Sequence, residues 1–224
     1  SDSNPVDRTE KFMFDGKRLI QHIIKQRYFE EEISNEVNLS YSNNLVTVTT
    51  DYLTSIYTLN SEGYASQCVY SLSSQNRIYQ FSYSAEGYLT GIVENIDDTE
   101  YSSTSLTYEN GDITSISSKM NGLENKFIYE PGEESSTYHL PCLGLLEIHP
   151  LTFHIEALYA GLLGKDPRHF TIHSCPAGSN DENTVYSYGF DKKGNPSRMI
   201  CQTTYAGGQA SYYPYTRNIS VSFE

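Results

Sequence analysis

Residues 81–92 read FSYSAEGYLTGI, and this stretch decides the fold class. Phe81 and Tyr83 are two positions apart, so both point to one face of a strand while the serine between them points to the other. The polar run that follows ends at Gly87, and glycine adopts the positive φ that a tight turn requires. Apolar residues then return up to Ile92. The stretch therefore predicts a β-hairpin with one buried face.

The same pattern recurs along the chain. Residues 57–68 read YTLNSEGYASQC, and residues 188–199 read YGFDKKGNPSRM. The related stretch 106–116, LTYENGDITSI, has a turn that is one residue shorter, and shorter beginnings of the unit occur at 12–16 (FMFDG) and 127–132 (FIYEPG). Units that start at positions 57, 81 and 106 are 24 and 25 residues apart, which is the length of a hairpin and its connection. Successive hairpins are therefore predicted to form a long meander.

The repeated hairpins predict a mainly all-β protein with an antiparallel sheet. A long meander leaves two edge strands, so the sheet must curl, close or have its edges covered. The outward positions of the units are Ser, Thr, Gln and Asn, which predicts an outer surface in contact with water. We expect a curved sheet or an open barrel-like shape. It is predicted to form a single domain over residues 11–224, preceded by a flexible tether at residues 1–10.

One segment departs from the strand pattern. Leu151, Ile155, Leu158 and Leu162 fall at helical spacing, with a proline before the first of them and a glycine after the last. This pattern predicts a helix at about 150–163. Its apolar stripe is expected to pack on the concave side of the sheet, because that contact buries the hydrophobic faces of both elements.

Composition excludes one class of partner. The chain of 224 residues carries 15 Lys and Arg against 28 Asp and Glu, which gives a net charge of −13. A protein with this charge repels phosphate backbones, and no basic stripe offsets the repulsion. We therefore expect no nucleic-acid partner.

Two known families share features with these segments. The unit Tyr-x₃-Gly-x-Leu-Thr-x-Ile at residues 83–92 resembles the YD (Rhs-type) repeat. The hairpin array, together with LYAGLLGK at residues 158–165, resembles an exported lipoprotein family of unknown function with a porin-like fold. That resemblance covers about residues 10–224. It implies the fold, export from the cytoplasm and a lipid anchor, and it carries over no catalytic residue.

The opening stretch also bears on location. Residues 1–7, SDSNPVD, are polar and resemble the segment that follows the lipidated cysteine of surface lipoproteins in Gram-negative gut anaerobes. The resemblance implies that acyl chains attach the protein to a membrane while the domain itself stays outside the bilayer. We expect a location at the outer membrane or cell surface, or in the periplasm.

Histidine and cysteine are the candidate metal ligands. Five of the six histidines lie between positions 139 and 173: His139, His149, His154, His169 and His173. Neither a His-Glu-x-x-His motif nor paired Cys spacing is present, so ordinary packed or surface histidines are the favoured interpretation, and no metal or cofactor is predicted.

Four cysteines leave the redox state open. Cys68, Cys142, Cys175 and Cys201 could form up to two disulfides, but none belongs to a C-x-x-C pair. A domain of this size does not need disulfides for stability, so we favour thiols.

Tyrosine is abundant, with 20 residues, and tryptophan is absent. Tyr205, Tyr212, Tyr213 and Tyr215 form the densest group and are the candidate ligand contacts, because tyrosine offers a large contact area at low entropic cost. The competing interpretation is that these residues are there as good strand formers.

Three classes of function remain after these observations. A repetitive β array without a catalytic motif favours a non-enzymatic binding or scaffold protein, with a glycan or a protein as its partner. A glycan-acting hydrolase that uses acids or histidines near the helix–sheet junction is the alternative, so enzymatic activity stays open. A structural subunit of an outer-membrane complex is the third class.

Overall fold

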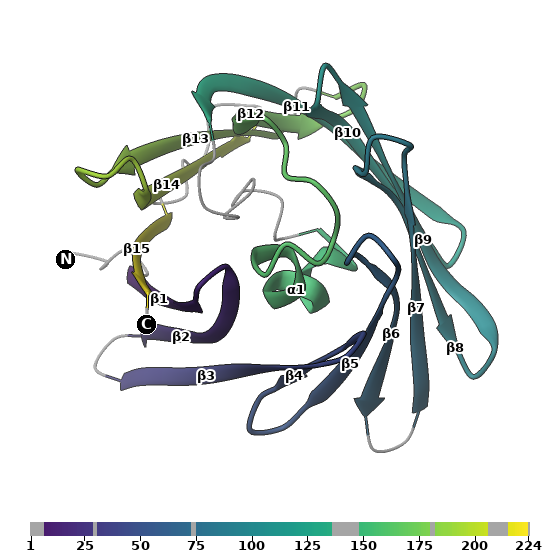
Figure 1. Ribbon diagram of the computed structural model, residues 1–224. Helices are drawn as coiled ribbons and strands as arrows, with labels where there is room; N and C mark the ends of the chain where they lie inside the picture. The colour runs from purple at the N-terminus through teal and green to yellow at the C-terminus, as the bar shows by residue number, and fades with distance from the viewer. Residues whose placement is uncertain are drawn as a thin grey trace.

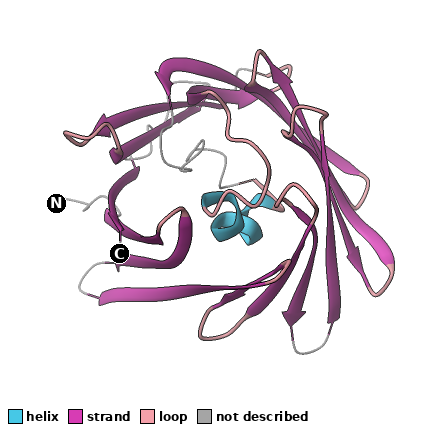
Figure 2. Cartoon of the chain, in the orientation of Figure 1, coloured by secondary structure: helices cyan, strands magenta, loops and turns pink. Residues whose placement is uncertain are grey.

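The computed structural model describes residues 7–28, 31–72, 75–135, 148–179, 182–205 and 215–223. Strands dominate this part of the chain (Figures 1 and 2). The strands are β1 Asp7–Asp15, β2 Arg18–Tyr28, β3 Glu31–Ser42, β4 Leu45–Thr49, β5 Thr54–Leu59, β6 Ala65–Leu72, β7 Gln75–Tyr83, β8 Leu89–Ile96, β9 Thr99–Glu109, β10 Asp112–Met120, β11 Leu123–Ser135, β12 His169–Pro176, β13 Glu182–Phe190, β14 Pro196–Tyr205 and β15 Tyr215–Phe223.

The sheet closes on itself. Each strand from β1 to β15 pairs antiparallel with the next in sequence, and β1 and β15 then pair in parallel to complete the barrel. The prediction of a mainly antiparallel all-β meander is confirmed, but the sheet is a closed barrel rather than a curved sheet or an open one. Closure satisfies the backbone groups of the two strands that would otherwise be edges.

The repeated units are hairpins, as predicted. The first and last residues of each twelve-residue unit are direct cross-strand partners: Tyr57 with Cys68, Phe81 with Ile92, and Tyr188 with Met199. The turn glycines have φ of +86°, +92° and +83° in the same order. Each unit therefore places one cross-strand pair of side chains on the inner face.

The two shorter stretches that resemble the start of the repeated unit, 12–16 and 127–132, form different structures. Residues 12–16 do form a hairpin, between β1 and β2. Residues 127–132 do not, because β11 continues through Gly132 to Ser135. A Cβ at Gly132 would lie 2.6 Å from Cγ2 of Ile172 on β12, so glycine serves here for close strand approach and not for a turn.

A short helical segment, the plug, lies inside the barrel (Figure 1). In the sequence it comes after β11 and before β12. The plug is the segment 148–159, in which the 3₁₀ turn η2, Leu151–His154, is followed by α1, Ile155–Tyr159, so the predicted helix at 150–163 is too long. The helix ends because Gly161 has φ of +71°, and the next carbonyl, that of Leu162, accepts a hydrogen bond of 2.7 Å from the backbone of Ala65 on β6. The chain thus leaves the helix to bond to the barrel wall. The predicted position of the plug on the concave side is confirmed.

The main core lies between the plug and the inner wall. Tyr57, Tyr79 and Tyr159 are at most 1% exposed, and Leu151 and Ala157 of the plug belong to the same cluster. None of the helical segments in the described residues is long and apolar enough to span a bilayer.

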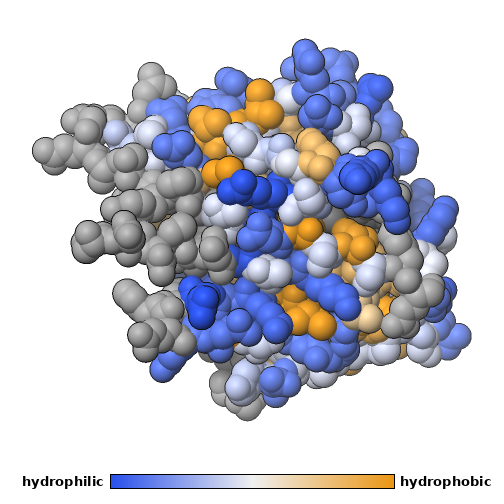
Figure 3. Space-filling model, turned by 90° about the vertical axis from the view of Figure 1, so that its left-hand side faces the viewer, coloured by the Kyte–Doolittle hydropathy of each residue, from blue (hydrophilic) through white to orange (hydrophobic). Residues whose placement is uncertain are grey.

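The face of the molecule seen in Figure 3 is mainly polar, with apolar side chains in separate patches. On β9, which lies on another part of the barrel, Ser105 and Thr107 are exposed while Leu106 between them is buried. Exposed apolar side chains such as Ile56, Val69 and Val185 interrupt this surface.

Candidate ligand-binding cavity

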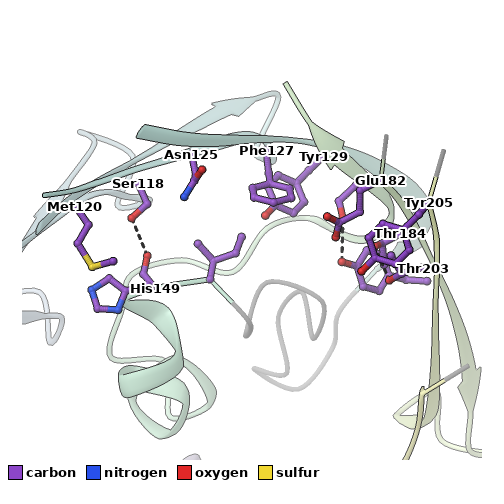
Figure 4. A pocket seen from close by; sticks show the side chains of 13 residues that line it. Ser118, Met120, Asn125, Phe127, Tyr129, His149, Glu182, Thr184, Thr203 and Tyr205 are labelled. Atoms are coloured by element: carbon purple, nitrogen blue, oxygen red, sulfur yellow. Dashed lines mark hydrogen bonds between the residues drawn. The ribbon is translucent and has the colours of Figure 1, made fainter. Parts of the chain in front are cut away.

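A cavity of about 370 Å³ lies inside the barrel between the plug and the wall formed by β10 to β14 (Figure 4). The plug contributes Ile148 and His149 to its lining. Four strands of the wall, β10, β11, β13 and β14, contribute alternate residues, such as 127 and 129 of β11, because side chains two positions apart share the inner face, and β12 contributes Ser174. A volume of this size is typical of small-molecule sites.

Aromatic side chains form one part of the lining. Phe127 and Tyr129 of β11 and Tyr205 of β14 are labelled in Figure 4. Tyr186 of β13 also lines the cavity. The Tyr186 hydroxyl is 3.0 Å from the hydroxyl of Ser174 on β12, the cross-strand partner of Tyr129. The rings are therefore held on a continuous stretch of wall.

Polar groups converge on the same space. The hydroxyls of Thr184 and Thr203 are 2.9 Å apart across β13 and β14, and Ser118 donates a 3.0 Å hydrogen bond to the carbonyl of His149. Asn125 and Glu182 also line the cavity. A few directed polar groups among aromatic rings are the usual composition of a specific small-molecule site.

A buried carboxylate positions the plug at the edge of the cavity. Glu94 is fully buried on β8 and accepts hydrogen bonds from the Arg77 guanidinium at 3.0 Å, the Tyr79 hydroxyl at 3.1 Å and the Ser102 hydroxyl at 2.7 Å. The carboxylate oxygen that accepts the hydrogen bond from Ser102 is also 2.9 Å from Nε2 of His149. The imidazole that lines the cavity is thus fixed by a carboxylate whose other contacts come from the wall.

A second buried network joins the barrel seam to the plug. Arg217 of β15 binds both carboxylate oxygens of Glu10 on β1, at 2.7 and 2.9 Å, and donates a 2.8 Å hydrogen bond to the Tyr159 hydroxyl of α1. Nδ1 of His22 is 3.1 Å from Glu156 of α1, and its Nε2 is 3.5 Å from Glu10. The seam and the plug are therefore connected by ionic contacts.

These contacts shift the titration of the groups involved. Burial by itself would raise the pKa of Glu10, but the contact with His22 and the charges of Arg217 and Arg8 hold that pKa well below its usual value. Burial likewise opposes protonation of His22, yet its contacts with Glu10 and Glu156 raise the pKa of the imidazole. The network thus favours the ionised forms.

His154 of the plug behaves in the opposite way. It is fully buried, with Nδ1 2.8 Å from the Tyr57 hydroxyl and its ring edge-on to Tyr79 at 4.3 Å between centroids. Burial, together with the nearby His149, lowers the pKa of His154 to about 3. The imidazole is therefore neutral at physiological pH.

The sequence-predicted tyrosines have different positions. Tyr205 lines the cavity from the end of β14. Tyr212 and Tyr213 lie outside the described residues, and Tyr215 is placed only by its backbone, which pairs with Cys201 at the start of β15. The more central rings Tyr129 and Tyr186 were not predicted, although each is an aromatic residue at an inward position of a strand.

The candidate metal ligands do not gather. His169 is 2.9 Å from Asp112 and His173 is 3.4 Å from Glu130, while His139 lies outside the described residues. Within the part of the chain that the structure describes, no group of three or more His, Cys, Asp or Glu side chains could hold a metal ion.

The cysteines can be placed in part. Cys68 is a buried free thiol and Cys175 is a half-buried one on β12, which agrees with the favoured interpretation for these two residues. Cys201 faces the lumen from β14, beside Tyr186. Cys142 lies outside the described residues.

Comparisons with known proteins give a family and a fold. Residues 13–198 match the family model of a domain of unknown function (DUF4595) with porin-like fold. The structure is similar to the crystal structure of a porin-like protein from Bacteroides uniformis ATCC 8492, with a TM-score of 0.77 and 27% identity over 89% of this chain and 83% of that one.

A second crystal structure shows the same fold at lower similarity. The porin-like protein from Bacteroides vulgatus ATCC 8482 has a TM-score of 0.56 and 11% identity over 84% of this chain and 94% of that one. No curated protein sequence matches the chain. The expected porin-like family is confirmed, whereas the likeness to YD repeats and to lipoproteins stays an expectation.

Proposed function

The chain belongs to the DUF4595 family of domains of unknown function with porin-like fold, and we propose that it is a non-enzymatic binding protein that holds a small ligand inside its barrel. The observation that carries this proposal is the cavity of about 370 Å³, where aromatic rings and directed polar groups converge between plug and wall. A concave, partly apolar site with a few polar groups is the usual form of a ligand pocket.

Binding is favoured over glycan hydrolysis by the state of the acids at the helix–sheet junction. Glycoside hydrolysis needs two carboxyl groups that face the substrate, one of which transfers a proton. Here Glu10 is held by Arg217, Glu94 by Arg77 and His149, and Glu156 by His22. These carboxylates therefore join the plug to the wall, which is a structural task.

The proposal is tested by filling the cavity. Thr203 points into it, and its neighbour Thr204 is exposed on the outer face of β14. We expect Thr203→Arg to weaken ligand binding by at least about tenfold, because the added side chain occupies the lumen, and Thr204→Arg to leave binding unchanged.

The measurement is ligand-observed NMR with a panel of sugars, amines, carboxylates and small aromatic compounds, applied to the wild type and both variants. Equal melting temperatures would show that both variants fold. A complete lack of binding, or hits that Thr203→Arg does not weaken, would refute a role for the lumen.

We also propose that the protein is exported and attached to the cell envelope by lipid. The support is the polar composition of the residues before β1 and the likeness of that stretch to lipoprotein tethers. In cells that express the full-length precursor, an alkyne palmitate analogue should label the protein and the label should follow it into the detergent phase. Unlabelled protein in the cytosolic fraction would contradict this location.

A further inference from the structure

We infer that the ligand of the cavity is a small organic cation, a primary amine or a quaternary ammonium compound. This inference rests on the proposed function, because it names the chemical class that the same cavity binds. Three features of the lining support it: the aromatic rings, the carboxylate of Glu182, and the absence of lysine and arginine among the described residues.

The rings supply a surface that attracts cations. Phe127 and Tyr129 come from β11, while Tyr186 and Tyr205 come from β13 and β14. The face of an aromatic ring carries negative charge density, and several rings around one space form the usual site for ammonium groups. A ligand in this space meets rings from three strands.

Glu182 adds a negative charge at one end of the cavity. It is half-buried at the start of β13, opposite Tyr205 in the strand register, and lies beside Tyr205 and Thr184 in Figure 4. Among the described residues no cation pairs with its carboxylate, in contrast to Glu94, which is paired with Arg77. A half-buried carboxylate without a counter-ion gains stability when a cation binds beside it.

The rest of the described lining contains no side chain that neutralises the negative charge of Glu182. Neither lysine nor arginine contributes to the cavity wall in the described residues, and the imidazole of His149 is already bound to Glu94. An anionic ligand would therefore meet Glu182 without a positive group to offset it. The net charge of −13 also raises the local concentration of cations around the barrel.

A neutral sugar fits the lining less well. Sugars use aromatic faces and hydroxyl partners, both of which are present, but they would leave the Glu182 carboxylate without a counter-charge. The charge state of the ligand is therefore the property that separates the two classes.

Choline and its uncharged tert-butyl isostere are matched probes, because they share shape and hydroxyl group and differ in charge. In calorimetric titrations of the wild type, choline should bind at least about tenfold more tightly than the isostere. Glu182→Gln should remove most of this difference by weakening choline binding alone, and Tyr205→Leu should weaken choline binding several-fold. Glu109→Gln, which removes an exposed carboxylate from β9, is the control and should change nothing.

The outcomes separate this inference from the proposal on which it rests. If the isostere binds as tightly as choline, or if Glu182→Gln changes neither, the cationic ligand is wrong. If neutral sugars bind and Thr203→Arg blocks them while choline, butylamine and other amines do not bind, the inference fails and the binding function stands. If no compound shows binding that Thr203→Arg weakens, both fail.

Discussion

Replacement of Arg217 by methionine should lower the free energy of unfolding by about 4 kcal/mol and the melting temperature by about 10 °C. Arg217 is 3% exposed and Glu10 is fully buried, so the variant leaves a carboxylate in the protein interior with only Arg8 and His22 as positively charged neighbours. The loss also frees the Tyr159 hydroxyl of the plug. A buried charge that loses its main partner is one of the costliest single changes known in proteins.

Chemical denaturation measures this effect, with Lys25→Met as the control. Lys25 and Glu32 form an ion pair on neighbouring strands at 3.4 Å, but both side chains are more than half exposed, so its loss should cost less than about 1 kcal/mol. The double variant Glu10→Leu/Arg217→Met should recover much of the lost stability, because it removes both charges. If Arg217→Met lowers the free energy of unfolding no more than Lys25→Met does, the pair of Glu10 and Arg217 does not stabilise the pairing of β1 with β15.

Hydrogen exchange shows which strands are destabilised by the substitution. In Arg217→Met, protection should fall most in β1 and β15, which pair in parallel at the seam, and least in β6 to β8 on another part of the wall. An even loss of protection over all strands would indicate a global effect instead.

The strand pattern could be predicted because it depends on local chemistry. Positions 57, 81 and 188 each begin a run in which inward residues alternate and a glycine turn follows, and both features act within twelve residues. Gly132 was misread because its sequence neighbours resemble a turn, whereas its real constraint comes from Ile172, forty positions away. A glycine that permits close approach and one that permits a turn look the same in a single sequence.

Closure and the cavity could not be predicted for a related reason. The seam depends on Glu10 and Arg217, which are 207 positions apart, and nothing in either local sequence indicates the other. The cavity wall likewise combines strands from residue 118 to residue 205 with two residues of the plug. Of the candidate ligand contacts, Tyr205 lines the cavity together with Tyr129 and Tyr186. A dense run of tyrosines in the sequence does not indicate rings that lie at inward positions on separate strands.

His154 should make the protein less stable as the pH falls, and the substitution His154→Phe should remove this part of the pH dependence. The pKa of its imidazole is lowered to about 3 in the folded protein, mainly by burial, whereas the unfolded chain binds the proton near pH 6.5. The unfolded state therefore holds more protons between these values. The contribution of His154 to stability is complete above about pH 6.5 and is lost as the pH falls toward 3, by about 1.4 kcal/mol per pH unit.

The variant His154→Phe isolates this contribution from the other titrating groups. Phenylalanine keeps a ring between Tyr57, Tyr79 and Phe81 but has no proton to exclude, and it loses the hydrogen bond with the Tyr57 hydroxyl. At pH 7.5 the variant should be less stable than the wild type by about 1 kcal/mol. At pH 4.5, where the wild type has lost roughly 3 kcal/mol through this group, the variant should be the more stable protein.

Urea denaturation at intervals between pH 4.5 and 7.5 should therefore give two curves that cross. The shifts of Glu10 and His22 are common to both proteins and cancel in the difference. Curves that stay parallel over this range would mean that solvent reaches the imidazole and protonates it in the folded state. The plug would then be loosely packed. It would not form a fixed wall on its side of the cavity.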